Sequence, residues 1–173
     1  MSKQVEEYTV QRVTYHSALP PSEVLAQLDK LVHRDASDGQ ALPALLTSKT
    51  KGEIVQRLND ISGGDFMVFG TLRHSDWIKT YFEMDAMPTL VSYKVGSPLV
   101  ATTMLAHTLL TSLYLPTKIL IVGKDVDESK GTKVIYDLPS SMIAAGDRGD
   151  LRDAALVLDA KLEDLTKRIT GAL

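Results

Sequence analysis

The chain contains no cysteine among its 173 residues. Disulfide bonds, zinc–thiolate sites, iron–sulfur clusters and thiol nucleophiles are therefore excluded. An excess of basic residues is missing as well, because 19 lysines and arginines stand against 22 aspartates and glutamates and the formal net charge is −3. A nucleic-acid surface usually needs positive charge to displace counterions from phosphates. We therefore expect no nucleic-acid partner.

Sequence patterns of well-known active sites are missing too. The chain has no GxGxxG pattern, no GxxxxGK pattern followed by serine or threonine, and no GxSxG pattern. Nucleotide hydrolysis, dinucleotide binding and esterase chemistry therefore have no support, and we expect no cofactor. Residues 125–129 begin like a calcium loop, but Lys130 stands where glycine is required and Tyr136 where a glutamate should close the site.

Targeting and membrane signals are weak. The first seven residues are polar and acidic, unlike a signal or transit peptide, so we expect a cytoplasmic protein. Residues 99–122 are apolar enough to resemble a membrane span, but Pro116 and Lys118 inside them are costly in hydrocarbon. We interpret this stretch as a buried helix followed by a buried strand, and we expect no membrane partner.

Periodicity and turn signals predict the main elements of the chain. Thr50 and Glu53 form a capping box that opens a helix, and Gly63 ends it. Apolar residues recur every three or four positions over 151–169, which indicates an amphipathic C-terminal helix over about 150–170. We further predict helices over 22–34 and from Ser97, a loop over 36–48, and strands over 7–15, 66–72, 89–95, 118–123 and 134–136.

These elements predict a single α+β domain over residues 1–173. The strands are separated by short connections, and the last two are joined by a loop of hairpin length, which favours an antiparallel sheet covered on one face by helices. Residues 66–72 are apolar on both sides of the strand, so we expect this strand near the centre of the sheet.

A polar cluster at the end of that strand is the main candidate site. If the extended backbone continues, His74 and Asp76 lie on one face, and the carboxylate supports the imidazole as a general base. Trp77, the one tryptophan, would form an apolar pocket wall. His107 is the second candidate base, and the candidate ligand-binding residues beside Trp77 are Tyr93, Met104 and Tyr114.

Plainer explanations exist for the same residues. A histidine at a strand end is commonly a hydrogen-bonded boundary residue, and His107 at a helix C-terminus interacts favourably with the helix dipole. Trp77 also fits a core or interface position. Together His74, His107 and Asp76 have the composition of a two-histidine, one-carboxylate metal site, although the spacing does not show that they meet.

A series of motifs resembles the domain-of-unknown-function 302 family, and more narrowly its fungal branch. The resemblance covers about residues 51–141, and the matching motifs follow in the family's order at 66–69, His74 and Trp77, 93–101, Met104 and His107, 113–116, 119–122 and 136–141. It implies a fold similar to the TATA-box-binding-protein-like class, with a curved antiparallel sheet packed against helices, and often a dimer. The family carries no established reaction, so the resemblance implies no catalytic residue.

Two classes of function follow from these observations. The first is a protein that binds a small apolar or aromatic metabolite, with cofactor-free acid–base catalysis by His74 or His107 as its enzymatic form. The second is a non-catalytic homodimeric interaction module built on the C-terminal helix and exposed edge strands. A metal site at the two histidines and Asp76 is a weaker third alternative.

Overall fold

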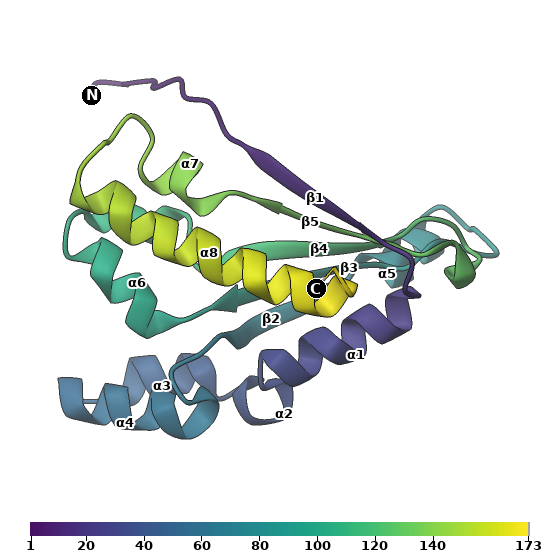
Figure 1. Cartoon of the computed structure of the whole chain (residues 1–173), viewed down its shortest axis with the longest axis horizontal. Coiled ribbons are helices and arrows are strands. Elements are labelled where there is room, and N and C mark those ends of the chain that lie inside the picture. The colour runs from purple at the N-terminus through teal and green to yellow at the C-terminus, as the bar shows by residue number, and fades with distance from the viewer. Residues whose placement is uncertain (173) are drawn as a thin grey trace.

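Five antiparallel strands form one sheet in the computed structural model, which describes residues 1–172 (Figure 1). The strands are β1 (Arg12–Ser17), β2 (Met67–Arg73), β3 (Leu90–Gly96), β4 (Thr117–Gly123) and β5 (Thr132–Asp137). Their order across the sheet is β1-β5-β4-β3-β2, and every neighbouring pair is antiparallel. The strand with four consecutive aliphatic residues, β4, therefore lies at the centre. The predicted single α+β domain with an antiparallel sheet and packed helices is confirmed.

Helical segments connect and flank the strands. They are α1 (Pro21–Leu31), α2 (Arg34–Ser37), α3 (Ala41–Thr47), α4 (Lys51–Ser62), α5 (His74–Tyr81), α6 (Pro98–Leu105), the 3₁₀ helix η1 (Leu109–Leu113), the 3₁₀ helix η2 (Glu128–Lys130), α7 (Pro139–Ile143) and α8 (Asp150–Thr170). Within residues 1–172, no helix is both long and apolar enough to cross a membrane. The apolar stretch 99–122 instead contributes most of α6, then η1 and most of β4.

One face of the sheet holds the main hydrophobic core. Side chains alternate along each strand, so Val91, Tyr93 and Val95 of β3 are all buried on this face. Helix α8 lies across it, with α1, α6 and α7 packed beside α8 (Figure 1). The buried residues of α8 recur at helical spacing and include Ala155, Leu158, Leu162, Leu165 and Ile169. The predicted C-terminal helix is confirmed, and Gly171 ends it with a φ of +69°.

The opposite face of the sheet is called the open face here. Its side chains are those that alternate with the core residues, and one row across it contains Leu72, Ser92, Leu120, Ile135 and Thr14. Most of these residues are partly or fully exposed. Helix α5 packs against β3, next to the β2 end of this row. The open face therefore presents a mixture of apolar and polar side chains.

The predicted central position of strand 66–72 is wrong, because β2 is an edge strand. Its apolar character on both sides has another cause. Met67 packs with Ala41, Ala44 and Leu58 in a second, smaller hydrophobic cluster that α3 and α4 form beside the sheet. Val68 points into the main core instead. Both sides of this edge strand are therefore covered.

The predicted loop over 36–48 is also wrong in part, because this segment contains the end of α2 and all of α3. These helices are short and carry no side-chain cap, so local signals for them are weak. The capping box is confirmed at its first half, since the backbone N–H of Glu53 donates to Thr50 Oγ1 over 3.2 Å. Ser97 precedes α6 as predicted, but its hydroxyl donates to the carbonyl of Gly64 and does not cap the helix.

Candidate functional site

The backbone turns into helix α5 at His74, so the side chain of His74 does not continue the strand pattern. His74 Nε2 lies 2.9 Å from Ser92 Oγ on the open face, and Trp77 Nε1 donates to His74 Nδ1 over 3.3 Å. An indole N–H can only donate, so Nδ1 accepts and the ring proton of neutral His74 sits on Nε2. Both ring nitrogens are thereby occupied.

Asp76 does not support His74 as sequence reasoning expects. Its exposed carboxylate accepts a hydrogen bond from Ser75 Oγ at 3.4 Å, one residue away in the same helix. The reason is the early start of α5. In a helix, side chains two positions apart point in different directions, whereas in a strand they share a face.

The second candidate base lies elsewhere. His107 follows α6 and is exposed, whereas His74 begins α5. Figure 1 places α5 and α6 at opposite ends of the sheet. Within residues 1–172, no group of three histidine, aspartate or glutamate side chains is close enough to hold a metal ion. The predicted constellation of His74, His107 and Asp76 is therefore not assembled.

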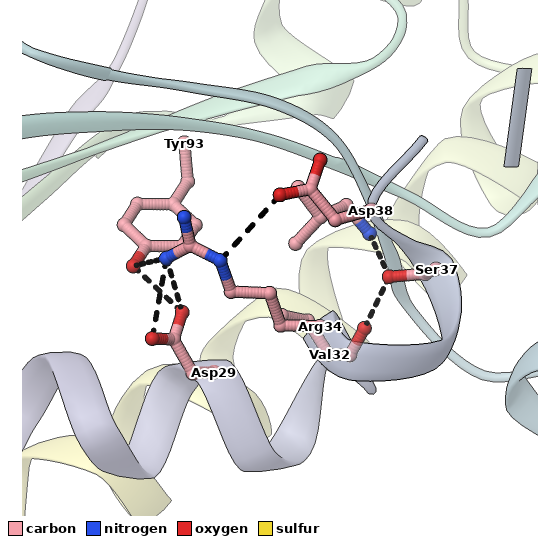
Figure 2. Close-up of polar contacts among 7 residues, drawn as sticks. Asp29, Val32, Arg34, Ser37, Asp38 and Tyr93 are labelled. Carbon is pink, nitrogen blue, oxygen red and sulfur yellow. Dashed lines mark hydrogen bonds and ion pairs between the residues drawn. The ribbon is translucent and has the colours of Figure 1, made fainter. Parts of the chain in front are cut away.

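Tyr93 is buried in the core face and carries a polar network that sequence reasoning missed. Its hydroxyl donates to Asp29 Oδ1 over 2.7 Å and accepts from Arg34 over 3.0 Å. Arg34 also binds both oxygens of Asp29, at 3.0 and 3.2 Å, and its guanidinium lies 5.6 Å from the centre of the tyrosine ring. Figure 2 shows the three side chains converging between α1, α2 and β3.

This network is an anchor and not a reactive site. Burial, with help from the hydrogen bond to Asp29, raises the pKa of Tyr93 far above its ordinary value, so the phenol stays protonated. His33 adopts a left-handed backbone conformation with φ of 51°, and this turn separates α1 from α2. Along the sequence, Asp29 is five residues from Arg34 and 64 residues from Tyr93, so no local sequence pattern predicts the cluster.

Tyr114 is likewise engaged in a structural contact. Its hydroxyl lies 2.8 Å from the hydroxyl of Tyr8, in the segment before β1. That hydrogen bond raises the pKa of Tyr114. Of the predicted ligand-binding residues, Tyr93 and Tyr114 therefore bind other side chains of the protein, and Trp77 binds His74.

Among the predicted ligand-binding residues, Met104 lines an apolar cavity. It is fully buried and packs beneath an apolar groove of about 310 Å³ between α6, α3 and the ends of β3 and β4. We call this the α6 groove. Its lining is almost entirely apolar and consists of Leu42, Leu45, Phe69, Gly96, Ser97, Pro98, Ala101, Thr102, Met104, Leu105, Ser112, Leu115, Pro116, Thr117 and Leu158.

Two of the four hydroxyl groups in the lining of the α6 groove donate to backbone carbonyls of the protein. Thr102 Oγ1 donates to the carbonyl of Leu99 over 2.8 Å, and Ser97 Oγ donates to the carbonyl of Gly64 over 3.1 Å. The groove therefore offers an apolar surface. A larger hollow of about 630 Å³ lies beside the loop at Gly146, but charged residues of this loop and of the first turn of α8 line it, so it lacks the apolar lining of a typical small-molecule site.

The 3₁₀ helix η1 exposes apolar side chains close to the groove in sequence. Leu109, Leu110 and Leu113 are 79%, 72% and 76% exposed, whereas Thr111 between them is fully buried. Ser112 of the same helix lines the groove. This is the reverse of the usual arrangement, in which leucine is buried and threonine is exposed. Leu113 begins the family motif at 113–116, but sequence reasoning did not single out Leu109 and Leu110, although the pattern Leu109-Leu110-x-x-Leu113 is visible in the chain.

Comparisons with known proteins give a family and a fold. A family model described as domain of unknown function DUF302 matches residues 46–169. A crystal structure of an uncharacterized conserved DUF302 protein from Bacillus stearothermophilus is similar, with a TM-score of 0.62 and 15% sequence identity. The similarity covers 91% of this chain and 97% of that one. No curated protein matches the sequence.

Proposed function

The chain belongs to the DUF302 family, whose function is unknown, and for this member we propose the binding of a small apolar molecule in the α6 groove. The observation that carries the proposal is the groove's apolar lining of 15 residues around a volume of about 310 Å³. Small-molecule sites have volumes from roughly 300 to 1,000 Å³ and are lined mainly by apolar side chains with few polar groups. The groove fits the lower end of that range.

The energetics favour a slender ligand. Each methylene that leaves water contributes about 0.8 kcal/mol, so a chain of about eight carbons contributes roughly 6 kcal/mol before the costs of association. A gross free energy of that size corresponds to roughly 40 μM, so the costs of association place the expected dissociation constant in the millimolar range. An aliphatic chain or a single aromatic ring matches the groove better than a large metabolite.

Binding without catalysis is the form of the function that we propose. Neither His74 nor His107 lines the α6 groove. A general base must lie within hydrogen-bond reach of the proton that it removes, directly or through one water molecule. The groove residues that we identify contain no group that titrates near neutral pH, so they supply contact and not proton transfer.

Isothermal titration calorimetry with 1-octanol tests this proposal. The Ala101→Phe variant places a ring in the groove, whereas Ala106→Phe places the same ring at an exposed position just after α6. We expect saturable binding of 1-octanol to the wild type and to Ala106→Phe, and a loss of at least about tenfold in affinity in Ala101→Phe. Equal binding by both variants would show that the ligand sits elsewhere, and no binding to the wild type would refute the proposal.

A homodimeric interaction module is the second candidate, and exposed aromatic residues favour it. Trp77, Tyr81 and Phe82 are 51%, 74% and 64% exposed, and the Tyr81 and Phe82 rings stack edge to face with centres 5.0 Å apart. Aromatic residues are enriched in protein interfaces. The sequence predicts an interface on the C-terminal helix and exposed edge strands, but most apolar residues of α8 are buried in the protein's own core. We therefore place the contact at the end of α5 and at Phe82, which follows it.

Light scattering coupled to gel filtration tests this candidate. We expect a dimer for the wild type at about 100 μM and a monomer for the double variant Tyr81→Ser with Phe82→Ser. Leu156→Ser with Val157→Ser is the matched control, because these residues are exposed on α8. A monomeric wild type would refute the second candidate and leave the α6 groove proposal untouched. Membership of the family's fungal branch and a cytoplasmic location also stay predictions.

A further inference from the structure

We propose that the ligand of the α6 groove is an anionic amphiphile, whose apolar chain fills the groove and whose charged head binds Lys94 and Lys118. This inference rests on the proposed function and names the class of molecule that the groove takes. It predicts a single chain with a carboxylate or phosphate head, taken from solution.

The two lysines form a like-charged pair across neighbouring strands. Lys94 of β3 lies directly opposite Lys118 of β4, and both side chains are exposed. Residues directly opposite each other in antiparallel strands have Cβ atoms about 4.5–5.5 Å apart, and like charges there are destabilising. Two exposed lysine side chains that begin this close together can both direct their ammonium groups at one anion.

No acidic side chain neutralises this pair. Within residues 1–172, neither lysine forms an ion pair or a side-chain hydrogen bond. The strand residue opposite Lys94 on its other side is Gly70, which has no side chain, and the space beside it is open. The one carboxylate on the open face of the strands, Asp137, stands across from Lys118 when the β4–β5 register is continued past Leu120, but it pairs with Arg12 at 2.7 Å instead.

The lysine pair adjoins the wall of the α6 groove. Gly96 and Pro116 line the groove and pack together, since a Cβ at Gly96 would lie 3.4 Å from Pro116 Cβ. Lys94 is two residues before Gly96 in β3, and Lys118 is two residues after Pro116, which directly precedes β4, so each lysine lies on the same side of the extended chain as its groove residue. That spacing is about 7 Å along a strand, within the reach of a lysine side chain.

Comparison of octanoate with 1-octanol tests the inference by calorimetry at low ionic strength and pH 7. The two probes share a chain length and differ in the head group. We expect the wild type to bind octanoate about tenfold more tightly than 1-octanol, because two ammonium groups attract the carboxylate. The preference should shrink to about twofold in 0.5 M salt, because exposed charges are screened.

The double variant Lys94→Gln with Lys118→Gln carries the decisive comparison. We expect it to bind 1-octanol as the wild type does and to lose the preference for octanoate. Its Tm should be unchanged or raised, because a repulsive pair is removed. The control variant, Lys79→Gln with Lys130→Gln, changes the net charge equally on α5 and η2 and should keep the preference.

The possible failures are distinguishable. If neither probe binds the wild type, the proposed function itself fails. If both probes bind equally, or if the Lys94 and Lys118 variant keeps its preference, the groove proposal stands and this inference is overturned. Association with phosphatidylserine vesicles without octanoate binding would also overturn it, because the lysines would then recognise a bilayer surface.

Discussion

Removal of one oxygen atom from the core tests the Asp29–Arg34–Tyr93 network. In Tyr93→Phe, the ring and its packing remain, but Asp29 loses a 2.7 Å donor and Arg34 loses a 3.0 Å acceptor. Hydrogen bonds to charged groups contribute about 1.5–3 kcal/mol. We therefore expect Tyr93→Phe to lower the free energy of unfolding.

The lower part of that range applies here. Asp29 and Arg34 still bind each other, and their side chains are 34% and 31% exposed, so water replaces part of the lost contact. We expect a loss of about 1.5–2 kcal/mol. For a chain of this length, 1 kcal/mol shifts Tm by roughly 2–4 °C, so Tm should fall by roughly 3–8 °C.

Thermal unfolding followed by circular dichroism measures this shift at pH 7. The matched control is Tyr114→Phe, which removes a hydroxyl bonded only to the exposed Tyr8 and should change stability by less than about 0.5 kcal/mol. A Tyr93→Phe shift below 1 °C, or equal to that of Tyr114→Phe, would refute the reasoning that this network anchors α1 and α2 to the sheet.

Three further predictions concern stability. Leu162→Ala in α8 should cost about 3–5 kcal/mol in urea unfolding, because Leu162 is fully buried in the main core, and a cost below 1 kcal/mol would contradict that packing. Gly131→Ala should lower Tm much more than Gly39→Ala. Both glycines have positive φ, so alanine is strained at either position, but only at Gly131 would the added Cβ also collide with a backbone atom, the Ser17 carbonyl oxygen. Equal shifts would exclude the collision as the cause. Burial raises the pKa of Tyr136 to about 12, above the value of about 10 for an unfolded tyrosine. The stability that Tyr136 contributes should therefore be complete below pH 10 and decline between pH 10 and 12, where the phenol of the unfolded chain ionises first. Chemical denaturation should show a smaller decline in that window for Tyr136→Phe than for the wild type.

The elements that the sequence predicts well are those with strong local signals. The capping box at Thr50, the end of α4 at Gly63 and the repeat in α8 all depend on residues within one or two turns of each other. The run of aliphatic residues in β4 predicts a buried strand for the same reason. Short connections then predict antiparallel pairing, because parallel strands need a long crossover.

The failures come from contacts between distant segments. Strand β2 looks central because α3 and α4 cover its second side, and nothing in 66–72 distinguishes covering by helices from covering by strands. Helix α5 begins at His74, directly after the last residue of β2, and no glycine or proline marks the change from strand to helix. The sequence pattern therefore does not predict where α5 begins. The hydrogen-bond partner of His74, Ser92, is 18 residues away, on β3.

The groove itself is the least predictable feature. Its walls come from α3, α6, η1, α8 and three strands, so no single motif encodes it. Its position on a semi-buried helix makes Met104 a candidate from the sequence, but its neighbours in the groove are far from it in the chain. The exposed leucines of η1 offered the clearest unused signal, since leucine at three of five positions is unusual for a polar turn.

Methyl NMR of Met104 tests the central claim most directly. The protein has six methionines, and Met104 is fully buried beneath the α6 groove, so its ε-methyl resonance reports on that site. On titration with octanoate, we predict a saturable shift of the Met104 signal that is absent in Ala101→Phe. A Met104 signal that stays unmoved while exposed Met1 or Met84 responds would contradict the account.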